Sequence, residues 1–185
     1  MFRRRSKQQN LSEYANCSDF KQIFTQDMAG LHLLAFLLTA DHDKAEECFV
    51  AGLEDSIKGN PVFREWARSW SKRAIIKRAI KMLAPSPADP RTGGGFSFDS
   101  GPGERDVLVA SVTALAPFQR FVFAMSVLEG YSATECALLL HCTVKEVVAA
   151  RAEGLQHVSL RRAADFSQAG RPVTWKEFLP ATGVA

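Results

Sequence analysis

The sequence predicts an all-α protein of two small helical domains joined by a flexible linker. Three observations lead to this prediction. First, apolar residues recur at three- and four-residue intervals over most of the chain. Second, a Ser, Thr or Asp stands three residues before a Glu at several expected helix starts. Third, a segment rich in Pro, Gly and Ser interrupts the apolar pattern. We expect a flexible arm at 1–18, a helical domain at 19–83, the linker at 84–104, a second helical domain at 105–165 and a tail at 166–185.

The N-terminal domain is expected to begin with two helices. Apolar residues at helical spacing predict one long amphipathic helix over residues 19–39. Asp43 stands three residues before Glu46, which is the spacing of a capping box, so a second helix should run from there to about Lys58. The Gly-Asn-Pro sequence at 59–61 would end it, because proline cannot continue the backbone hydrogen-bond ladder.

A third helix, from Pro61 or Val62 to Leu83, combines cations with aromatic rings. These residues are Arg64, Trp66, Arg68, Trp70, Lys72, Arg73, Lys77, Arg78 and Lys81. Cations suit the phosphates of a nucleic acid, and indole rings suit unstacked bases. The helix is thus a candidate nucleic-acid surface, and the alternative is a solvated basic face whose Trp residues belong to the core.

Two pairs of residues with capping-box spacing organise the C-terminal domain. They are Ser132 with Glu135 and Thr143 with Glu146. The two helix starts leave room for a short helix at 133–140, a tight turn at 141–142 and a second helix from Val144. That is the outline of a helix-turn-helix, whose second helix reads the DNA major groove, although any helical hairpin could use the same caps. The residues expected to pack across the crossing are Ala137, Leu140, Val144, Val147 and Leu155.

The composition is ordinary for a globular protein and points away from several classes. The chain has 46% hydrophobic and 23% charged residues, which is ordinary. Its net charge of only +3 is not an excess of positive charge that would by itself indicate a nucleic-acid partner. The longest apolar run, 33–38, is too short to span a bilayer, so we expect a cytoplasmic protein with no membrane partner. Cys17, Cys48, Cys136 and Cys142 have no metal-binding spacing and are expected to be buried reduced thiols. Without a phosphate-binding loop or a metalloprotease motif, we expect no enzymatic activity, cofactor, metal or small-molecule substrate.

The stretch from Leu115 to Val144 follows a known pattern. Its matching residues are Leu115, Gln119, Arg120, Val122, Phe123, Leu128, Glu129, Gly130, Ser132, Glu135, Ala137 and Val144. In these residues the chain resembles the C-terminal region of sigma-70 family initiation factors of the extracytoplasmic-function type. Two N-terminal segments resemble the second conserved region of the same family. The residues concerned are Leu38, Thr39, Asp41, Ala45, Glu46 and Glu47, and then Phe63, Arg64, Trp66, Arg73 and Ile80.

The resemblance implies a sigma factor that directs RNA polymerase to promoters for transcription initiation. In the family, the C-terminal helix-turn-helix (region 4) docks on the −35 element, which here implicates Ser132, Thr143, Lys145, Glu146, Ala149 and Arg151. The basic, aromatic helix of region 2 opens and holds the −10 element, which implicates Arg64, Trp66, Arg68, Trp70, Lys72, Arg73, Lys77 and Arg78. The second helix binds the clamp of the polymerase largest subunit, which implicates Asp43, Glu46, Glu47, Val50 and Ala51. The implied partners are core RNA polymerase and promoter DNA. Whether an anti-sigma factor also binds and holds the protein inactive stays open.

Two departures from the family pattern keep other functions open. Where relatives carry Gln-Glu on the face offered to polymerase, this chain has Val50 and Ala51. Where relatives place Lys, Ser and Arg in the middle of the reading helix, it has Val-Ala-Ala at 148–150. One alternative is a diverged sigma-like protein that works through protein interaction, as a competitor or co-regulator. The other is a plain helix-turn-helix regulator that acts independently of polymerase.

Overall fold

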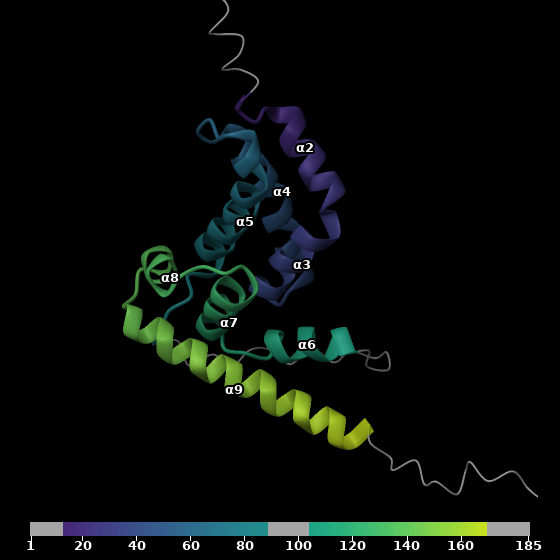
Figure 1. Ribbon diagram of the computed structural model, residues 1–185, viewed down its shortest axis with the longest axis vertical. Coiled ribbons are helices and arrows are strands. Elements are labelled where there is room, and N and C mark those ends of the chain that lie inside the picture. Colours follow the sequence, from purple (N-terminus) through teal and green to yellow (C-terminus); the bar gives the residue numbers. More distant parts are fainter. Residues whose placement is uncertain (1–12, 89–103, 170–185) are drawn as a thin grey trace, which may run out of the picture.

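The computed structural model describes residues 13–88 and 104–169, which are helical nearly throughout (Figure 1). The α-helices are α2 (Cys17–Gln26), α3 (Met28–Thr39), α4 (His42–Lys58), α5 (Ala67–Leu83), α6 (Glu104–Thr113), α7 (Pro117–Phe123), α8 (Ala133–Leu140) and α9 (Val144–Ala169). A 3-10 turn, η1 (Arg64–Trp66), precedes α5, and a π-helical turn, η2 (Ala124–Leu128), follows α7. Within these ranges the only β-type pairing is one isolated bridge, so the all-α prediction is confirmed.

Three predicted segments lie largely outside the described residues. They are the arm, of which 1–12 are not described, the linker, of which 89–103 are not described, and the tail, of which 170–185 are not described. None of the helices that the structure describes is long and apolar enough to cross a membrane.

The single helix predicted for residues 19–39 is wrong, because the chain forms two helices there. Between α2 and α3, Asp27 has φ −111° and ψ 26°, which interrupts the helical backbone. The Asp27 carboxylate accepts a hydrogen bond from Arg68 Nη1 of α5 at 2.8 Å. A Cβ on Gly30 would lie only 2.6 Å from Asp27 Oδ1, so the glycine leaves room for this carboxylate. An ion pair with a distant helix thus accompanies a break that local spacing does not reveal.

The capping box predicted at Asp43 and Glu46 is also wrong. The cap of α4 is Asp41, which has an extended backbone and whose Oδ1 accepts the Lys44 N–H at 3.1 Å. Asp43 lies within the first helical turn, where its backbone is already helical. Only a residue with non-helical φ and ψ can place its side chain over the free N–H groups of the first turn, and Asp41 is that residue.

The third helix begins later than its predicted start at Pro61 or Val62. Val62 accepts a backbone hydrogen bond from Ala15 at 2.8 Å, and the Phe63 ring stacks on Tyr14 with centroids 4.8 Å apart. Phe63 has φ −58° and ψ 140°, so these contacts hold it extended. The chain then makes the η1 turn and enters α5 at Ala67.

The helix-turn-helix outline is confirmed, with one correction to its packing. α8 ends at Leu140 and is followed by His141, whose φ of 53° is left-handed, and α9 begins at Val144. Ala137, Leu140 and Val147 are buried as expected. Two other residues predicted to pack at the crossing face outward instead. They are Val144, 44% exposed, and Leu155, 40% exposed.

The cysteine prediction holds only in part. All four thiols are free; Cys48 and Cys136 are buried, Cys142 is half-buried, and Cys17 is exposed, contrary to expectation. Burial raises the pKa of Cys48 and of Cys136 to about 11. These two thiols are therefore protonated at neutral pH and pack as small apolar side chains.

The helices before and after the linker share one core. We call residues 13–88 the N-terminal half and residues 104–169 the C-terminal half. Leu38 and Ile75 of the first belong to the same buried cluster as Phe121 and Met125 of the second. Figure 1 shows α7 beside α3, with α6 and α9 along one side of the molecule. The division into two domains stays a prediction, but in this arrangement the two halves are packed together.

Arg120 of α7 joins the halves through a buried guanidinium. It is 3% exposed, and its Nε and Nη2 donate to the carbonyls of Leu38 at 3.1 Å and Thr39 at 3.3 Å, in the last turn of α3. Nη1 donates to the carbonyls of Thr113 and Leu115 at 3.4 and 3.3 Å. Burial lowers the pKa of Arg120 to about 10, so it stays charged at neutral pH. A cation also suits the negative end of the α3 dipole.

Candidate nucleic-acid interface

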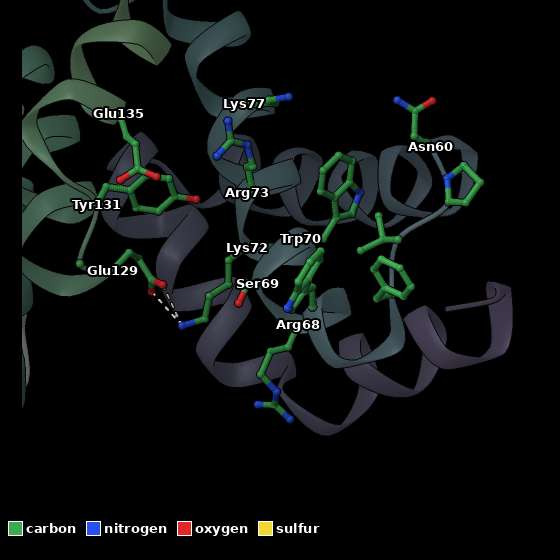
Figure 2. A pocket seen from close by; sticks show the side chains of 15 residues that line it. Asn60, Arg68, Ser69, Trp70, Lys72, Arg73, Lys77, Glu129, Tyr131 and Glu135 are labelled. Atoms are coloured by element: carbon green, nitrogen blue, oxygen red, sulfur yellow. Dashed lines mark hydrogen bonds and ion pairs between the residues drawn. The ribbon is translucent and has the colours of Figure 1, made fainter. Parts of the chain in front are cut away.

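A cleft of about 1010 Å³ lies between the N-terminal and C-terminal halves (Figure 2). One wall is α5 with the chain that leads into it, and the other is the turn that leads into α8. Residues of the first wall include Trp66, Arg68, Trp70, Lys72, Arg73 and Lys77, and those of the second are Glu129, Gly130, Tyr131 and Glu135. The cleft thus gathers most of the residues predicted to hold the −10 strand, whereas Arg64 and Arg78 do not line it.

Three aromatic side chains line the first wall of the cleft, and they are Phe63, Trp66 and Trp70. Phe63, which stacks on Tyr14, meets Trp66 edge-on with ring centroids 5.2 Å apart. Trp66 is 58% exposed, so it does not belong to the core and its indole is accessible to an unstacked base. Trp70 is half-buried, and Lys77 Nζ lies 5.8 Å from its ring centroid in a cation–π contact.

Two arginines on this side of the molecule are paired with carboxylates of the first helices. Arg64 Nη2 lies 3.3 Å from Asp19 Oδ2, and Arg68 Nη1 lies 2.8 Å from Asp27 Oδ2. Both arginine side chains are more than half exposed, so a phosphate can reach them, but it would compete with the adjacent carboxylate. Such exposed pairs contribute about 0.2–1 kcal/mol each, which a DNA phosphate can match.

The wall contributed by the C-terminal half is acidic. Glu129 accepts two hydrogen bonds from Lys72 Nζ, at 2.8 and 3.1 Å. Burial raises the pKa of the Tyr131 phenol, and the nearby Arg73 guanidinium opposes that shift. Hydrogen bonds from Ser132 hold the pKa of Glu135 below its ordinary value, so this carboxylate is ionised at neutral pH. A phosphate that binds Lys72 in this cleft would therefore compete with Glu129.

The charge left over on α5 lies toward its C-terminal end. Within the described residues, three cations of α5 pair with carboxylates, namely Arg68, Lys72 and Arg78, and Arg73 lies beside the Tyr131 phenol. Lys77 and Lys81 have no such partner there. Each phosphate contact contributes to the salt dependence of binding, with a slope of roughly 0.7 per contact for single strands. Internal pairing reduces the number of free contacts, so binding here should depend on salt less steeply than the count of cations suggests.

In the helix-turn-helix, half of the predicted DNA contacts act as helix caps. Glu135 accepts the Ser132 N–H at 2.9 Å, and the Glu135 N–H donates to Ser132 Oγ at 3.2 Å. Thr143 and Glu146 repeat this arrangement at the start of α9, with distances of 2.8 and 3.2 Å. These four side chains are exposed, but their polar atoms are already engaged in the two capping boxes.

The remaining predicted contacts lie on the exposed surface of α9. Lys145, Ala149 and Arg151 are exposed there. They alternate with apolar side chains, since Val144 is 44% exposed and Val148 is 55% exposed. This face of the reading helix is therefore a mixture of two cations with valines rather than a continuous basic stripe.

The residues predicted to contact polymerase lie on one side of α4. Asp43, Glu46 and Glu47 are exposed, Val50 is 50% exposed, and Ala51 is partly covered beside them. Glu47 Oε1 lies 3.8 Å from Arg78 Nη2 of α5, and Arg78 does not line the cleft. This side of α4 is therefore acidic and carries one exposed apolar side chain, that of Val50.

Sequence reasoning missed the acidic partners of the cleft. Glu129 was recognised only as part of a pattern, and Asp19 and Asp27 were not singled out at all. No local signal could have found them, because each meets its cation across 41 to 57 positions of sequence. Among the described residues, no group of three or more His, Cys, Asp and Glu side chains is placed to hold a metal ion.

Comparison with known protein families and with curated proteins finds no match to this chain. Among solved structures, the chain is similar to the sigma factor RpoE from Bartonella quintana, determined in complex with the anti-sigma factor NepR. The two share 17% identity with a TM-score of 0.47, over 80% of this chain and 98% of that chain. The function proposed below therefore rests on the residues of this chain.

Proposed function

We propose that this protein is a sigma-like transcription factor that directs core RNA polymerase to promoter DNA. The observation that carries the proposal is the presence, in one chain, of an exposed Trp66 and a half-buried Trp70 among the cations of α5, together with a doubly capped helix-turn-helix. Indoles beside cations suit a single strand, and a helix-turn-helix suits a duplex. Both surfaces occur in the segments that resemble the corresponding sigma regions.

In this proposal the two surfaces bind different parts of one promoter. Trp66 and Trp70 stack on unpaired bases of the −10 element, while Lys72, Arg73 and Lys77 neutralise the adjacent phosphates. Lys145 and Arg151 contact phosphates of the −35 duplex. The mechanism is non-catalytic, because the protein only contributes binding energy that places polymerase at a start site and favours the open strand.

Polymerase attachment is the part of the proposal that is easiest to test. Purified core RNA polymerase is incubated with the immobilised protein at moderate salt, beside a variant that carries Glu46→Arg and Glu47→Arg. We expect the native chain to retain polymerase and the variant to lose it, because the exposed acidic side of α4 would meet a basic clamp surface. Glu153→Arg makes the same kind of charge change on α9 and should leave retention intact.

The second candidate is a diverged sigma-like protein that works through protein interaction alone. The observation that favours it is the apolar exposure of both expected contact faces, with Val50 at 50% on α4 and Val144 and Val148 at 44% and 55% on α9. If the native chain retains no polymerase and supports no promoter-specific transcript, this second function replaces the first.

A further inference from the structure

We propose that Tyr14 is a positioning residue for single-stranded DNA, because it holds the chain before α5 in the conformation that presents the Trp66 ring to a base. The inference rests on the proposed function, since it concerns the same binding surface. Tyr14 does not line the cleft, so it acts through the residues that do. We call residues 13–16, which contain Tyr14 and lead into α2, the strap.

The strap is joined to the wall of the cleft through its backbone. The sequence predicts a flexible arm as far as residue 18, yet residues of the strap make specific contacts. The Ala15 N–H donates to the Val62 carbonyl at 2.8 Å, and Tyr14 forms an antiparallel bridge with Phe63. Val62 and Phe63 themselves line the cleft. The strap therefore pairs with the part of the wall that lies between α4 and α5.

Three aromatic rings connect the strap to the exposed indole. Tyr14 stacks on Phe63, with ring centroids 4.8 Å apart and an interplanar angle of 19°. Phe63 meets Trp66 with centroids 5.2 Å apart and an angle of 85°. Because the Phe63 ring lies against both neighbours, its position limits the orientations of the indole. Trp66 is still 58% exposed, so a base can stack on it.

The backbone from Phe63 to Trp66 makes the same connection. Phe63 has φ −58° and ψ 140°, and the Trp66 N–H donates to the Phe63 carbonyl at 2.9 Å, which closes the η1 turn. The place of Trp66 thus depends on Phe63 through a ring contact and through a hydrogen bond. Without the Tyr14 ring, this turn would sample more conformations, and ordering it at the moment of binding would cost affinity.

An ion pair supports the turn from the start of α2. Asp19 Oδ2 accepts the Asn16 N–H at 2.9 Å, which completes the capping box of α2. The same oxygen accepts a hydrogen bond from Arg64 Nε at 3.3 Å, and Arg64 is the first residue of η1. The last residue of the strap and the first residue of the turn therefore share one carboxylate. This arrangement keeps the strap aligned with the turn that carries Trp66.

The stack of Tyr14 on Phe63 lies at the surface rather than in the core. Both side chains are half-buried, and neither belongs to the two buried apolar clusters of the described residues. Truncation of Tyr14 should therefore leave the fold intact. The expected effect is on the orientation of Trp66, which is why we assign Tyr14 a role in binding rather than in folding.

The affinity of the full chain for a fluorescein-labelled single-stranded oligonucleotide tests the proposal. Tyr14→Ala should lower the affinity about two- to tenfold, which is the usual cost of ordering a side chain on binding. Tyr14→Phe keeps the stacking ring and should restore binding to within about twofold of the native chain. Fluorescence anisotropy gives the affinities, and circular dichroism checks that each variant is folded.

His42→Ala is the matched control for the loss of a stacked surface ring. The exposed His42 ring stacks on Phe36 with centroids 4.4 Å apart and an angle of 21°, and neither residue lines the cleft. This variant should bind the oligonucleotide as the native chain does. A loss equal to that of Tyr14→Ala would overturn the proposal, because any missing stack would then weaken binding.

A double-mutant cycle separates positioning from a general structural role. If Tyr14 acts through the indole, Tyr14→Ala should have no further effect in a chain that already carries Trp66→Ala. Equal losses in the two backgrounds would overturn the proposal, as would native affinity of Tyr14→Ala or a failure of Tyr14→Phe to restore binding.

Failure of this inference and failure of the proposed function give different results. If Trp66→Ala weakens binding and Tyr14→Ala does not, only the positioning role is wrong. If the native chain does not bind the oligonucleotide, or if Trp66→Ala binds as tightly as the native chain, the proposed binding of a base by Trp66 is wrong. The positioning role of Tyr14 is then wrong as well.

Discussion

The ammonium group of Lys72 in α5 lies 2.8 and 3.1 Å from the two carboxylate oxygens of Glu129, in the turn before α8. The two residues are 57 positions apart and join the halves of the molecule across the cleft. The Glu129 side chain is 15% exposed and that of Lys72 is 35% exposed, so the pair is partly shielded from water. The protein thus holds one of its own carboxylates where a phosphate of the proposed DNA strand would bind.

Replacing this carboxylate should strengthen the binding of single-stranded DNA. Glu129→Gln removes the charge and frees Lys72, and we expect affinity to rise about two- to fivefold, the range that corresponds to a partly exposed ion pair. The measurement is fluorescence anisotropy with a labelled single-stranded oligonucleotide at low and moderate salt. The salt dependence should steepen, because one more phosphate contact becomes available.

Glu54→Gln is the matched control for this substitution. Glu54 Oε2 lies 2.8 Å from Lys58 Nζ on α4, in an exposed pair that does not line the cleft. This variant should bind the oligonucleotide as the native chain does. An unchanged affinity for Glu129→Gln as well would show that the Lys72–Glu129 pair does not compete with phosphate.

The exposed indole of Trp66 should contribute strongly to the same binding. Trp66→Ala is expected to lower affinity for single-stranded DNA by about fivefold to a hundredfold, the usual cost of losing one stacked base. Trp66→Phe keeps a flat ring and should recover part of the loss. The stability of the fold should change little, because the side chain is 58% exposed. Equal affinity of all three proteins would remove Trp66 from the proposed site.

Arg120 should stabilise the contact between the halves. Arg120→Met leaves the carbonyls of Leu38 and Thr39 in α3 without their donor, and we expect the free energy of unfolding to fall by about 2–4 kcal/mol. Denaturant titration measures the change. Arg161→Met removes an exposed arginine of α9 and should stay within about 0.5 kcal/mol of the native chain. A loss for Arg120→Met no larger than that of the control would contradict a buried bridging role.

The two capping boxes of the helix-turn-helix should make stability sensitive to acid. Hydrogen bonds from Ser132 and Thr143 hold the pKa values of Glu135 and Glu146 below the ordinary 4.5. A carboxyl group whose pKa is lowered by folding contributes its full stability above its unfolded pKa and loses it as the pH falls through the folded value. The free energy of unfolding should therefore decline below about pH 4.5.

A paired substitution isolates the capping contribution to that pH dependence. The Ser132→Ala, Thr143→Ala variant lacks both hydroxyls, so the two carboxyl groups should titrate closer to their unfolded values. We expect it to be less stable at neutral pH, by about 1 kcal/mol per lost cap. Its stability should also fall less steeply in acid, as measured by denaturant titration from pH 3 to 7. Parallel curves for the two proteins would show that other carboxylates, such as Asp41, dominate the acid response.

The C-terminal helices could be predicted because their signals are local. Ser132 caps a helix through Glu135, three residues away, and such a contact forms whenever that one turn is helical. The same rule failed at Asp43, because Asp41 lies two residues earlier and takes the cap. Two candidate caps so close together are separated only by which of them adopts an extended backbone.

The apolar periodicity of α9 does not show which of its faces is buried. Val144 and Leu155 have helical spacing and were expected to be buried, yet the buried stripe of α9 is formed by Val147, Ala150 and Val158. Both stripes are apolar, so the pattern alone does not tell which one packs. The position of α7 decides, because Phe123 lies against Gly154, with 3.4 Å from its ring to the place of a Cβ.

By itself the sequence determined the helical class, the helix-turn-helix with its caps, and the gathering of cations and indoles near α5. Each of these depends on residues within a turn or two of one another. The tertiary structure alone decided that Lys72 pairs with Glu129, that Asp27 at the break between α2 and α3 pairs with Arg68, and that the two halves share a core. Ion pairs and packing act through space between residues brought together by folding, so positions 41 and 57 residues apart acquire their partners only in the folded chain.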